Sequence, residues 1–593
     1  MSKYLDWLEE VKKDEGQLEA LSRSGHCVVI AGPGTGKTRT LVLKAAKLLY
    51  EEVFQPRGIA CVTYAHAMAE ELRRQLEDLG VSYESYNIFI GTLHSFCFSN
   101  ILMPFGKVYG IPVPDPLRFA SDKQQATIYA EIWRKLNSKQ QNILPIPVRD
   151  RTTGELLSRL PIDFQKYRRT HLNEQDVDDK NPYLDELVDT YEGILLESKT
   201  TDFDLAMKWS VQLVEKQEFV RGSLESKYPW LLVDEYQDLG LALHRIVKAL
   251  TSQTSLKLFA IGDPNQCIYD FTGANPDYFL ELEKAVDFYG QPIRLNINYR
   301  SCPEIIDNAK KIPPIPVKQQ CHRAEESGLF RTFKSNKQFD VLVNTIRKLE
   351  ERKEIAPRDI LILGRDNNTC KNIVNAIKKG YPELPISKSA GQIYDSRKPL
   401  LEWVENLAQY SVGLNNIRFN DLLNFWVKLH STGNESGSDA LSFANRLKLF
   451  NALEEAKKYS DSAMKWLIKI ATSIKLEEKF VEYKLEQPDD IDEFSKLKTA
   501  LGTNGEWRSF NLHQFASIVT KDNQLSVETL HSSKGQQRKA VIIARAELLN
   551  TRFHEQQIAS QRLMYVGMTR AKDILIVLHD GSSYFVRNVL GRE

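Results

Sequence analysis

The segment AGPGTGKT, residues 31–38, combines closely spaced glycines with a lysine and a hydroxyl residue. It follows the apolar run Cys27–Ile30 and precedes the helix-like stretch RTLVLKAAKLLYEE. A strand, a glycine-rich turn and a helix in this order let backbone N–H groups close around phosphate oxygens at the positive end of the helix. A glycine-rich turn formed by chance is the alternative, and the flanking strand and helix disfavour it. The segment therefore predicts a phosphate-binding loop.

Each residue of this loop has an expected task. Lys37 is placed to reach the β- and γ-phosphates of a nucleotide, and the hydroxyl of Thr38 is placed to bind Mg²⁺. The glycines that allow the backbone to approach the phosphates are Gly32, Gly34 and Gly36.

A second segment, the acidic LLVDEYQD at 231–238, joins an apolar strand to two adjacent carboxylates. Asp234 at the strand tip is expected to hold Mg²⁺ through water, and Glu235 to orient and deprotonate an attacking water. Taken alone, a solvated acidic strand end explains this run equally well. Together with the phosphate loop, the segment predicts a nucleoside triphosphatase.

The elements that position these groups are short apolar strands in two series. Apolar runs separated by helical periodicity indicate parallel α/β sheets, so two α/β cores are expected. The first series lies at 27–30, 59–64, 89–95, 230–236, 257–263 and 293–299. The second lies at 359–365, 527–532, 540–546 and 574–580. Two long stretches of helical character, at about 101–200 and 406–519, interrupt these series of strands. They are too long for structureless loops, so we expect each to be an inserted helical subdomain. The run STGNESGSDA in the second stretch predicts a flexible loop.

The composition narrows the class of protein. Among 593 residues, 79 Lys and Arg balance 78 Asp and Glu, for a net charge of +1, which excludes a polycation but allows a local basic groove. No apolar run approaches the ~20 residues of a membrane helix, so no membrane partner is expected. The seven cysteines are scattered without a C-x-x-C pair. They indicate reduced thiols and a cytoplasmic protein, and argue against a cysteine-based metal site.

Further segments carry a family resemblance. With the phosphate loop, and in the same order, LLVDEYQD (231–238), IGDPNQCIYDFTGA (261–274), NYRS (298–301), TLHSSKG (529–535) and YVGMTRA (565–571) resemble the UvrD/Rep group of superfamily 1 (SF1A) helicases. The resemblance extends from residue 17 to about 578. It implies an α/β fold of two RecA-like cores with parallel sheets, each carrying a helical insertion. The implied domains are core 1A at 1–100 and 201–290, insertion 1B at 101–200, core 2A at 291–405 and 520–593, and a reduced insertion 2B at 406–519.

The resemblance also implies a nucleotide site for ATP and Mg²⁺. Gln17 matches the glutamine that reads adenine, while Arg39 and Tyr299 match the residues that sandwich the base. Gln537 stands where the family has a glutamate that touches the nucleotide sugar, so it keeps a hydrogen-bonding group without the charge.

Three more residues match the family's catalytic set, beside Lys37 and Glu235. Gln266 matches the glutamine that senses the γ-phosphate, and Arg300 and Arg570 match two arginine fingers. Guanidinium groups there would neutralise charge on the transferring phosphoryl group. A surface salt bridge is the alternative interpretation of each arginine.

On the DNA side, the family stacks bases on aromatic residues along a groove. Tyr64 and Phe271 stand at such aromatic positions, and His94 and His531 match positions near the strand. Stacking is worth ~1–3 kcal/mol per base and tolerates any sequence, which suits a motor. Core packing is the alternative for the aromatics and structural hydrogen bonding for the histidines. Thr272 departs from the family, which has an arginine before Gly-Ala, and so removes one cationic contact.

The leading functional hypothesis is an ATP-dependent 3′→5′ single-stranded DNA translocase and helicase acting on single strands and on single-strand/duplex junctions. The polarity comes from the resemblance alone. The alternative is a DNA-stimulated ATPase that serves as the sensor subunit of a partner nuclease, as in anti-phage systems of the Gabija type. A signalling GTPase or small-molecule kinase is disfavoured, because no N-K-x-D guanine-reading motif is present.

Overall fold

The computed structural model describes most of the chain. The described residues are 2–64, 66–81, 86–149, 154–172, 181–352, 354–381, 384, 386–387, 398–414, 417–431, 443–476, 488–502, 505, 507–519, 524–549 and 554–589. They fall into two compact units: the first comprises 1–114, 126–336 and 530–593, and the second 115–125 and 337–529. The four-domain division expected from the sequence stays a prediction, and the run STGNESGSDA lies almost wholly outside the described residues.

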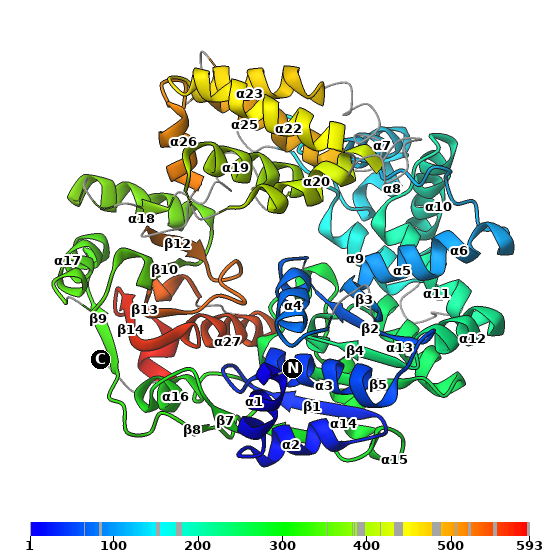
Figure 1. The fold of residues 1–593 in the computed structure, drawn as a ribbon, viewed down its shortest axis with the longest axis horizontal. Coiled ribbons are helices and arrows are strands. Elements are labelled where there is room, and N and C mark those ends of the chain that lie inside the picture. Colours follow the sequence, from blue (N-terminus) through cyan, green and yellow to red (C-terminus); the bar gives the residue numbers. More distant parts are fainter. Residues whose placement is uncertain are drawn as a thin grey trace. The chain divides into compact units, whose positions relative to one another are not determined.

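A parallel six-stranded sheet organises the first unit, with the order β3-β2-β4-β5-β1-β6 (Figure 1). Its strands are β1 (Cys27–Ala31), β2 (Gly58–Thr63), β3 (Asn87–Thr92), β4 (Trp230–Val233), β5 (Lys257–Gly262) and β6 (Ile293–Leu295). In the register, Val29 of β1 lies opposite Ile261 of β5 and Ile293 of β6. The strands are buried on both faces, which is why they appear in the sequence as continuous apolar runs.

Because the strands are parallel, their carboxyl ends share one edge of the sheet. The phosphate loop follows β1, the carboxylates Asp234 and Glu235 follow β4, and the turn bearing Gln266 follows β5. β1, β5 and β4 are adjacent in the sheet, so these three segments are brought together by its topology. The predicted α/β core is confirmed, and it places the chemistry at one edge.

Helices cover this sheet and build the rest of the first unit. Its apolar core joins β1 and β5 to residues of the helices α2 and α3. The helices before β4 are α1 (Ser2–Val11), α2 (Glu15–Ser22), α3 (Lys37–Lys47), α4 (His66–Asp78), α5 (Leu93–Cys97), α6 (Met103–Phe105), α7 (Asp122–Lys135), α8 (Ser138–Ile143), α9 (Ile162–Thr170), α10 (Pro182–Glu197), α11 (Phe203–Lys216) and α12 (Glu218–Lys227). Those after it are α13 (Leu241–Gln253), α14 (Asp277–Lys284), α15 (Val286–Tyr289), α16 (Pro303–Ala309) and α27 (His554–Met568).

The segment IRLNINY departs from the single strand expected at 293–299. β6 ends at Leu295, and β7 (Ile297–Asn298) pairs instead with β8 (Gln320–Cys321) in a separate two-stranded sheet. Beside this break, the side chain of Asn298 donates to the carbonyl of Pro33 at 3.0 Å and accepts from the backbone N–H of Arg300 at 2.9 Å. The strand thus breaks where it meets the phosphate loop.

The second sheet has the order β11-β12-β10-β13-β14-β9, and its strands are β9 (Leu329–Lys334), β10 (Ile360–Gly364), β11 (Ile386–Ser387), β12 (Leu525–Thr529), β13 (Arg538–Ile543) and β14 (Ala571–His579). The remaining helices belong to the second unit: α17 (Gln338–Glu350), α18 (Asn367–Gly380), α19 (Pro399–Val412), α20 (Phe419–Ser431), α22 (Phe443–Ala456), α23 (Ala463–Ser473), α25 (Pro488–Leu501) and α26 (Leu512–Val519). Their apolar core is centred on Trp403, Trp426 and Trp466.

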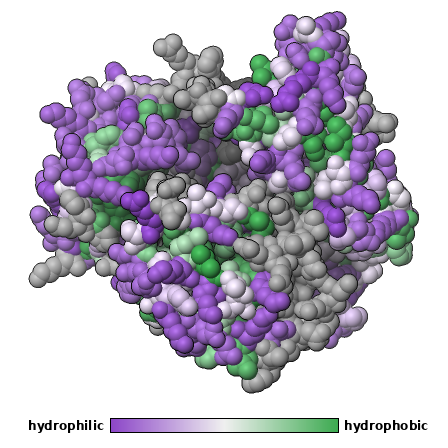
Figure 2. All heavy atoms as spheres, turned by 90° about the horizontal axis from the view of Figure 1, so that it is seen from above, coloured by the Kyte–Doolittle hydropathy of each residue, from purple (hydrophilic) through white to green (hydrophobic). Residues whose placement is uncertain are grey.

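One face of the molecule shows how polar and apolar side chains are distributed on it. On the face drawn in Figure 2, hydrophilic residues predominate and the hydrophobic ones form small separate patches. None of the helices that the structure describes is long and apolar enough to cross a lipid bilayer.

Candidate active site

The phosphate loop is a tight turn between β1 and α3. Gly34 and Gly36 have φ values of 77° and 88°, in the left-handed region that glycine adopts at little cost. A Cβ on Gly36 would lie 3.0 Å from the amide nitrogen of Gln17. α3 begins at Lys37, so its free N–H groups and positive dipole end face this turn. The loop therefore has the geometry of an anion cradle.

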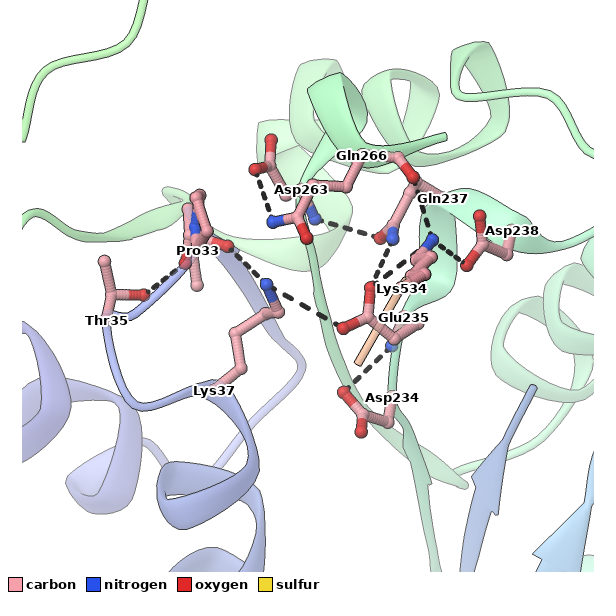
Figure 3. Close-up of polar contacts among 12 residues, drawn as sticks. Pro33, Thr35, Lys37, Asp234, Glu235, Gln237, Asp238, Asp263, Gln266 and Lys534 are labelled. Carbon is pink, nitrogen blue, oxygen red and sulfur yellow. Dashed lines mark hydrogen bonds and ion pairs between the residues drawn. The ribbon is translucent and has the colours of Figure 1, made fainter. Parts of the chain in front are cut away.

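Two lysines flank the carboxylate of Glu235 (Figure 3). The ammonium of Lys37 lies 3.8 Å from Oε1 of Glu235, and the ammonium of Lys534 lies 3.9 Å from Oε2. Lys534 also pairs with Asp238 and donates to the carbonyl of Gln266 at 2.8 Å. Glu235 has a left-handed backbone, with φ 50° and ψ 47°. Such a conformation in a non-glycine residue costs about 1 kcal/mol and is concentrated at functional sites.

The two adjacent carboxylates differ in protonation. Burial, and then the charge of Glu235, raise the pKa of Asp234. Burial also raises the pKa of Glu235, but the cations Lys37 and Lys534 outweigh it and hold that pKa below its ordinary value. Glu235 is therefore ionised in this arrangement, while Asp234 needs a further cation to stay ionised at neutral pH.

The oxygen atoms near Asp234 fit Mg²⁺. Asp234 is buried and its Oδ1 accepts from the backbone N–H of Glu235 at 2.9 Å. Together with the hydroxyl of Thr38 it offers hard oxygen ligands of the kind Mg²⁺ takes, which is held through one or two carboxylates plus phosphates and water.

Two guanidinium groups reach the same site from distant parts of the chain. Arg570 donates to the side-chain oxygen of Gln266 at 3.4 Å, and Arg300 donates to the carbonyl of Thr569 at 3.0 Å. Neither arginine has a carboxylate within ion-pair distance among the described residues. Burial and the like charge of Arg300 lower the pKa of Arg570 to about 9. The charge of Glu235 acts on both guanidinium groups, and Arg300 lies against Gly34 of the phosphate loop, where a cation can bind an anion.

The predicted base pocket is assembled around Asp14. The amide of Gln17 donates to Asp14 at 3.0 Å and to the carbonyl of Thr35 at 3.2 Å, which ties it to the phosphate loop. The hydroxyl of Tyr299 donates to the same carboxylate at 2.9 Å. Arg39 pairs with Glu10, on α1. The structure therefore brings Gln17 and Tyr299 together.

A pair of stacked rings lies next to Lys534. Tyr64 and Tyr269 stack with ring centroids 5.1 Å apart and planes 14° from parallel, and we refer to this pair as the tyrosine platform. The ammonium of Lys534 lies 5.4 Å from the centre of the Tyr269 ring. The hydroxyl of Tyr269 donates to the carbonyl of His531 at 3.2 Å. One side chain thus links the platform to Glu235.

For the remaining candidate residues, the structure gives contacts outside the cluster around Glu235 or gives none. His94 packs edge-on against the exposed Phe203, 6.1 Å between ring centroids. Gln537 is exposed, and its backbone carbonyl accepts from Arg538. The side chain of Phe271 lies outside the described part of the structure.

The expected set of site residues lacked Lys534 and Tyr269, as well as the carboxylates Asp14 and Asp238 that contact the site residues. Lys534 lies within the quoted motif TLHSSKG, and Tyr269 within IGDPNQCIYDFTGA, so the motifs pointed at both without assigning either a contact. The available signal for Tyr269 was the pair of aromatic residues in IYDFTG, of which the resemblance assigned only Phe271 to the DNA. Nothing in the local sequence indicates that Lys534 contacts Glu235, because the two are far apart in the chain.

Comparison with known proteins agrees with this geometry. Residues 13–287 match the model of the UvrD/REP helicase N-terminal domain, and residues 524–578 match that of the UvrD-like helicase C-terminal domain. The chain belongs to the UvrD-like group of superfamily 1 helicases. This UvrD-like chain is accordingly an ATP-dependent DNA helicase, an enzyme that uses a nucleotide and binds DNA.

Individual relatives support the same assignment at low identity. The ATP-dependent DNA helicase PcrA of Staphylococcus aureus (strain Mu50) is 24% identical over 639 residues, which cover 96% of this chain and 82% of that protein. A probable DNA helicase II homolog of Mycoplasma capricolum is 25% identical over 649 residues, covering 98% of this chain and 86% of that protein.

Proposed function

We propose that this UvrD-like helicase is a 3′→5′ single-stranded DNA translocase that couples ATP hydrolysis to stepping and strand separation. The observation that carries the proposal is the convergence on Glu235: Lys37 of the phosphate loop and Lys534 beside the tyrosine platform share this one carboxylate. Movement of the tyrosine platform would therefore shift Lys534 and change the electrostatic environment of Glu235, the residue expected to activate water.

The roles of the nucleotide-site residues follow from charge and position. Lys37, Arg300 and Arg570 supply positive charge where a triphosphate would lie and would stabilise charge on the transferring phosphoryl group. Thr38 and Asp234 would hold Mg²⁺, which when bound neutralises phosphate charge. The family resemblance assigns the adenine to Gln17, Arg39 and Tyr299.

Glu235 is the proposed general base. With two lysines near it, its carboxylate is ionised but a poor proton acceptor, since its pKa is held low. A γ-phosphate competes with Glu235 for Lys37, and loss of that cation raises the pKa of Glu235 toward the range of an effective base. The base would then be strengthened only when a nucleotide is present.

The polarity and the enzyme's activity are tested together on tailed duplexes. We expect unwinding of a duplex with a 3′ single-stranded tail and not of one with a 5′ tail, in the presence of ATP and Mg²⁺. Lys37→Ala is the matched control and should abolish hydrolysis and unwinding. Unwinding of the 5′-tailed duplex alone would contradict the proposed polarity.

The sensor alternative makes a different prediction for the same preparation. A DNA-stimulated ATPase that gates a partner nuclease would hydrolyse ATP on single-stranded DNA and leave both tailed duplexes intact. Displacement of streptavidin from a biotinylated 5′ end, measured in parallel, reports translocation without strand separation.

A further inference from the structure

Two adjacent arginines on α9 have different environments. Arg168 is fully enclosed, with 1% of its side chain exposed, and its guanidinium is saturated by Asp202 and Glu192. The side chain of Arg169 is 30% exposed, and within the described part of the chain its one carboxylate partner is Asp204, at 2.8 Å from its Nε. Arg168 is a structural ion-pair residue, whereas Arg169 lies at the edge of this cluster.

Arg169 extends from α9 to the segment that carries the tyrosine platform. Its Nη1 donates to the main-chain carbonyl of Thr272 at 2.9 Å. Its aliphatic stem lies over Gly273, where a Cβ would meet the Cδ of Arg169 at 3.4 Å. The hydroxyl of Thr272 in turn donates to the carbonyl of Tyr269 at 2.7 Å. Arg169 thus contacts Thr272 directly, and Thr272 connects it to the main chain of Tyr269.

The guanidinium has hydrogen-bonding capacity left. Arginine carries five N–H donors, and two atoms of this one are occupied, Nε by Asp204 and Nη1 by Thr272. Its Nη2 has no partner among the residues that the structure describes. The charge of Arg169 also reaches the platform, since it contributes to lowering the pKa of Tyr64 against the larger, raising effect of burial.

A partly exposed guanidinium beside a stacked aromatic pair has the two features that hold single-stranded nucleic acid: a base-stacking surface and a cation for the backbone. A guanidinium fork suits the oxygens of a phosphodiester better than an ammonium does. We propose that Arg169 binds a backbone phosphate of the DNA strand at the tyrosine platform, supplying the positive charge that Thr272 lacks. This inference rests on the proposed function, because it requires a single strand at the platform.

The test is a salt titration of oligothymidylate binding, measured by fluorescence anisotropy without nucleotide. Arg169→Ala should weaken binding roughly three- to tenfold and flatten the plot of log affinity against log salt by about 0.7, the contribution of one phosphate contact on a single strand. Lys248→Ala, which removes a cation of α13 that pairs with Glu281 on α14, is the matched control and should change neither quantity.

A second variant separates phosphate binding from scaffolding. Thr272→Arg, placed on the Arg169→Ala protein, returns a guanidinium to the same segment, and should restore most of the affinity and of the salt dependence. Thermal midpoints of all variants establish that they are folded. Unchanged binding by Arg169→Ala would overturn the inference, as would weaker binding with an unchanged salt slope and no rescue. If the unaltered protein fails to bind oligothymidylate, the proposed function itself is wrong.

Discussion

Lys534 contacts several groups of this site: the carboxylates of Glu235 and Asp238, the carbonyl of Gln266 and the ring of Tyr269. Burial lowers the pKa of Lys534, but Asp238 and Glu235 outweigh burial and raise it above the ordinary value. The residue is therefore charged, and it neutralises two buried carboxylates. Removing one member of a buried ion pair costs about 3–5 kcal/mol, because the other charge is left without compensation.

Lys534→Met should therefore lower the thermal midpoint and reduce DNA-stimulated ATP hydrolysis about 10²-fold, the effect of losing one preorganised charge. Lys534→Met combined with Asp238→Asn removes a buried charge of each sign, so it should recover stability without recovering activity. Thermal unfolding and ATP hydrolysis with and without single-stranded DNA measure the two effects. Recovery of both together would show that Lys534 acts only on stability.

Glu235 gives the second prediction at this scale. Glu235→Gln should reduce the kcat for ATP hydrolysis about 10²- to 10⁴-fold, because it removes the general base. Nucleotide binding should be kept, since Lys37 is released from its ion pair. Binding of a fluorescent ATP analogue and single-turnover hydrolysis separate these steps. Glu283→Gln, which removes a surface ion pair with Arg294, is the control. Normal ATP hydrolysis by the Glu235→Gln protein would exclude Glu235 as the base.

At the scale of elements, α1 supports a residue of the predicted base pocket. The guanidinium of Arg39 lies 4.9 Å from the centre of the Trp7 ring and pairs with Glu10. Both partners come from α1, one helical turn apart. The helix thus fixes the direction of a side chain on α3.

Trp7→Ala should raise the KM for ATP roughly two- to fivefold and leave kcat unchanged, since an exposed cation–π contact is worth about 0.5–1 kcal/mol. Leu5→Ala, on the exposed side of α1, is the matched control. Steady-state kinetics at saturating DNA supply the measurement. A fall in kcat at unchanged KM would mean that α1 does not act through the base pocket.

α13 and α14 are joined through a buried histidine that gives the fold a pH dependence. His244 bonds to the hydroxyl of Tyr236 at its Nδ1 and to Glu281 at its Nε2, both at 3.0 Å. The neutral ring satisfies both contacts, with Tyr236 donating and Nε2–H donating to Glu281. Burial lowers the pKa of His244 below 6.5, although Glu281 opposes the shift.

At pH values between the lowered pKa of His244 in the folded chain and 6.5, the unfolded chain therefore binds more protons at His244 than the folded chain does. The associated stability is fully present above about pH 6.5 and is lost as the pH falls through that window. Urea unfolding at a series of pH values should show this loss, and His244→Gln should remove that part of it. Equal pH dependence in the two proteins would contradict the assignment.

At the scale of the whole molecule, each compact unit has its own apolar core. The core of the second unit is built from helices α19 to α26 around Trp466, which is fully buried. The core of the first unit surrounds β1 and β5. Unfolding is therefore not expected to be a single two-state transition.

Trp466→Ala should destabilise the second unit by about 3–5 kcal/mol, the usual cost of removing a large buried aromatic side chain. In calorimetry one transition should move to lower temperature while the other stays in place. Basal ATP hydrolysis below that temperature should persist, since Lys37, Glu235 and Arg570 all lie in the first unit. A uniform shift of the whole melting profile would show that the units unfold together.

Local patterns were sufficient to predict much of this molecule. The phosphate loop, the strands of the first sheet, the strands β10, β12, β13 and β14 and the carboxylates after β4 were visible because each depends on neighbours in sequence: apolar runs that are buried on both faces, and glycines where φ must be positive. The edge strands β9 and β11 of the second sheet were not predicted: β9 is partly exposed and β11 has only two residues, so neither forms a continuous apolar run. The break of the expected strand at Asn296 was not predicted; it lies beside a long-range contact of Asn298 with Pro33 of the phosphate loop, which the local sequence does not reveal.

The sequence by itself determined the chemistry of this protein: parallel strands bring the segments after β1, β4 and β5 to one edge, so residues close to strand ends must meet there. Arg300 and Arg570 were expected from the resemblance, whereas only the tertiary structure added Lys534 and Arg169. Lys534 and Asp238 are separated by 296 positions, and Arg169 and Thr272 by 103. Such contacts depend on how whole elements pack against one another, and no periodicity or motif spacing encodes that packing locally.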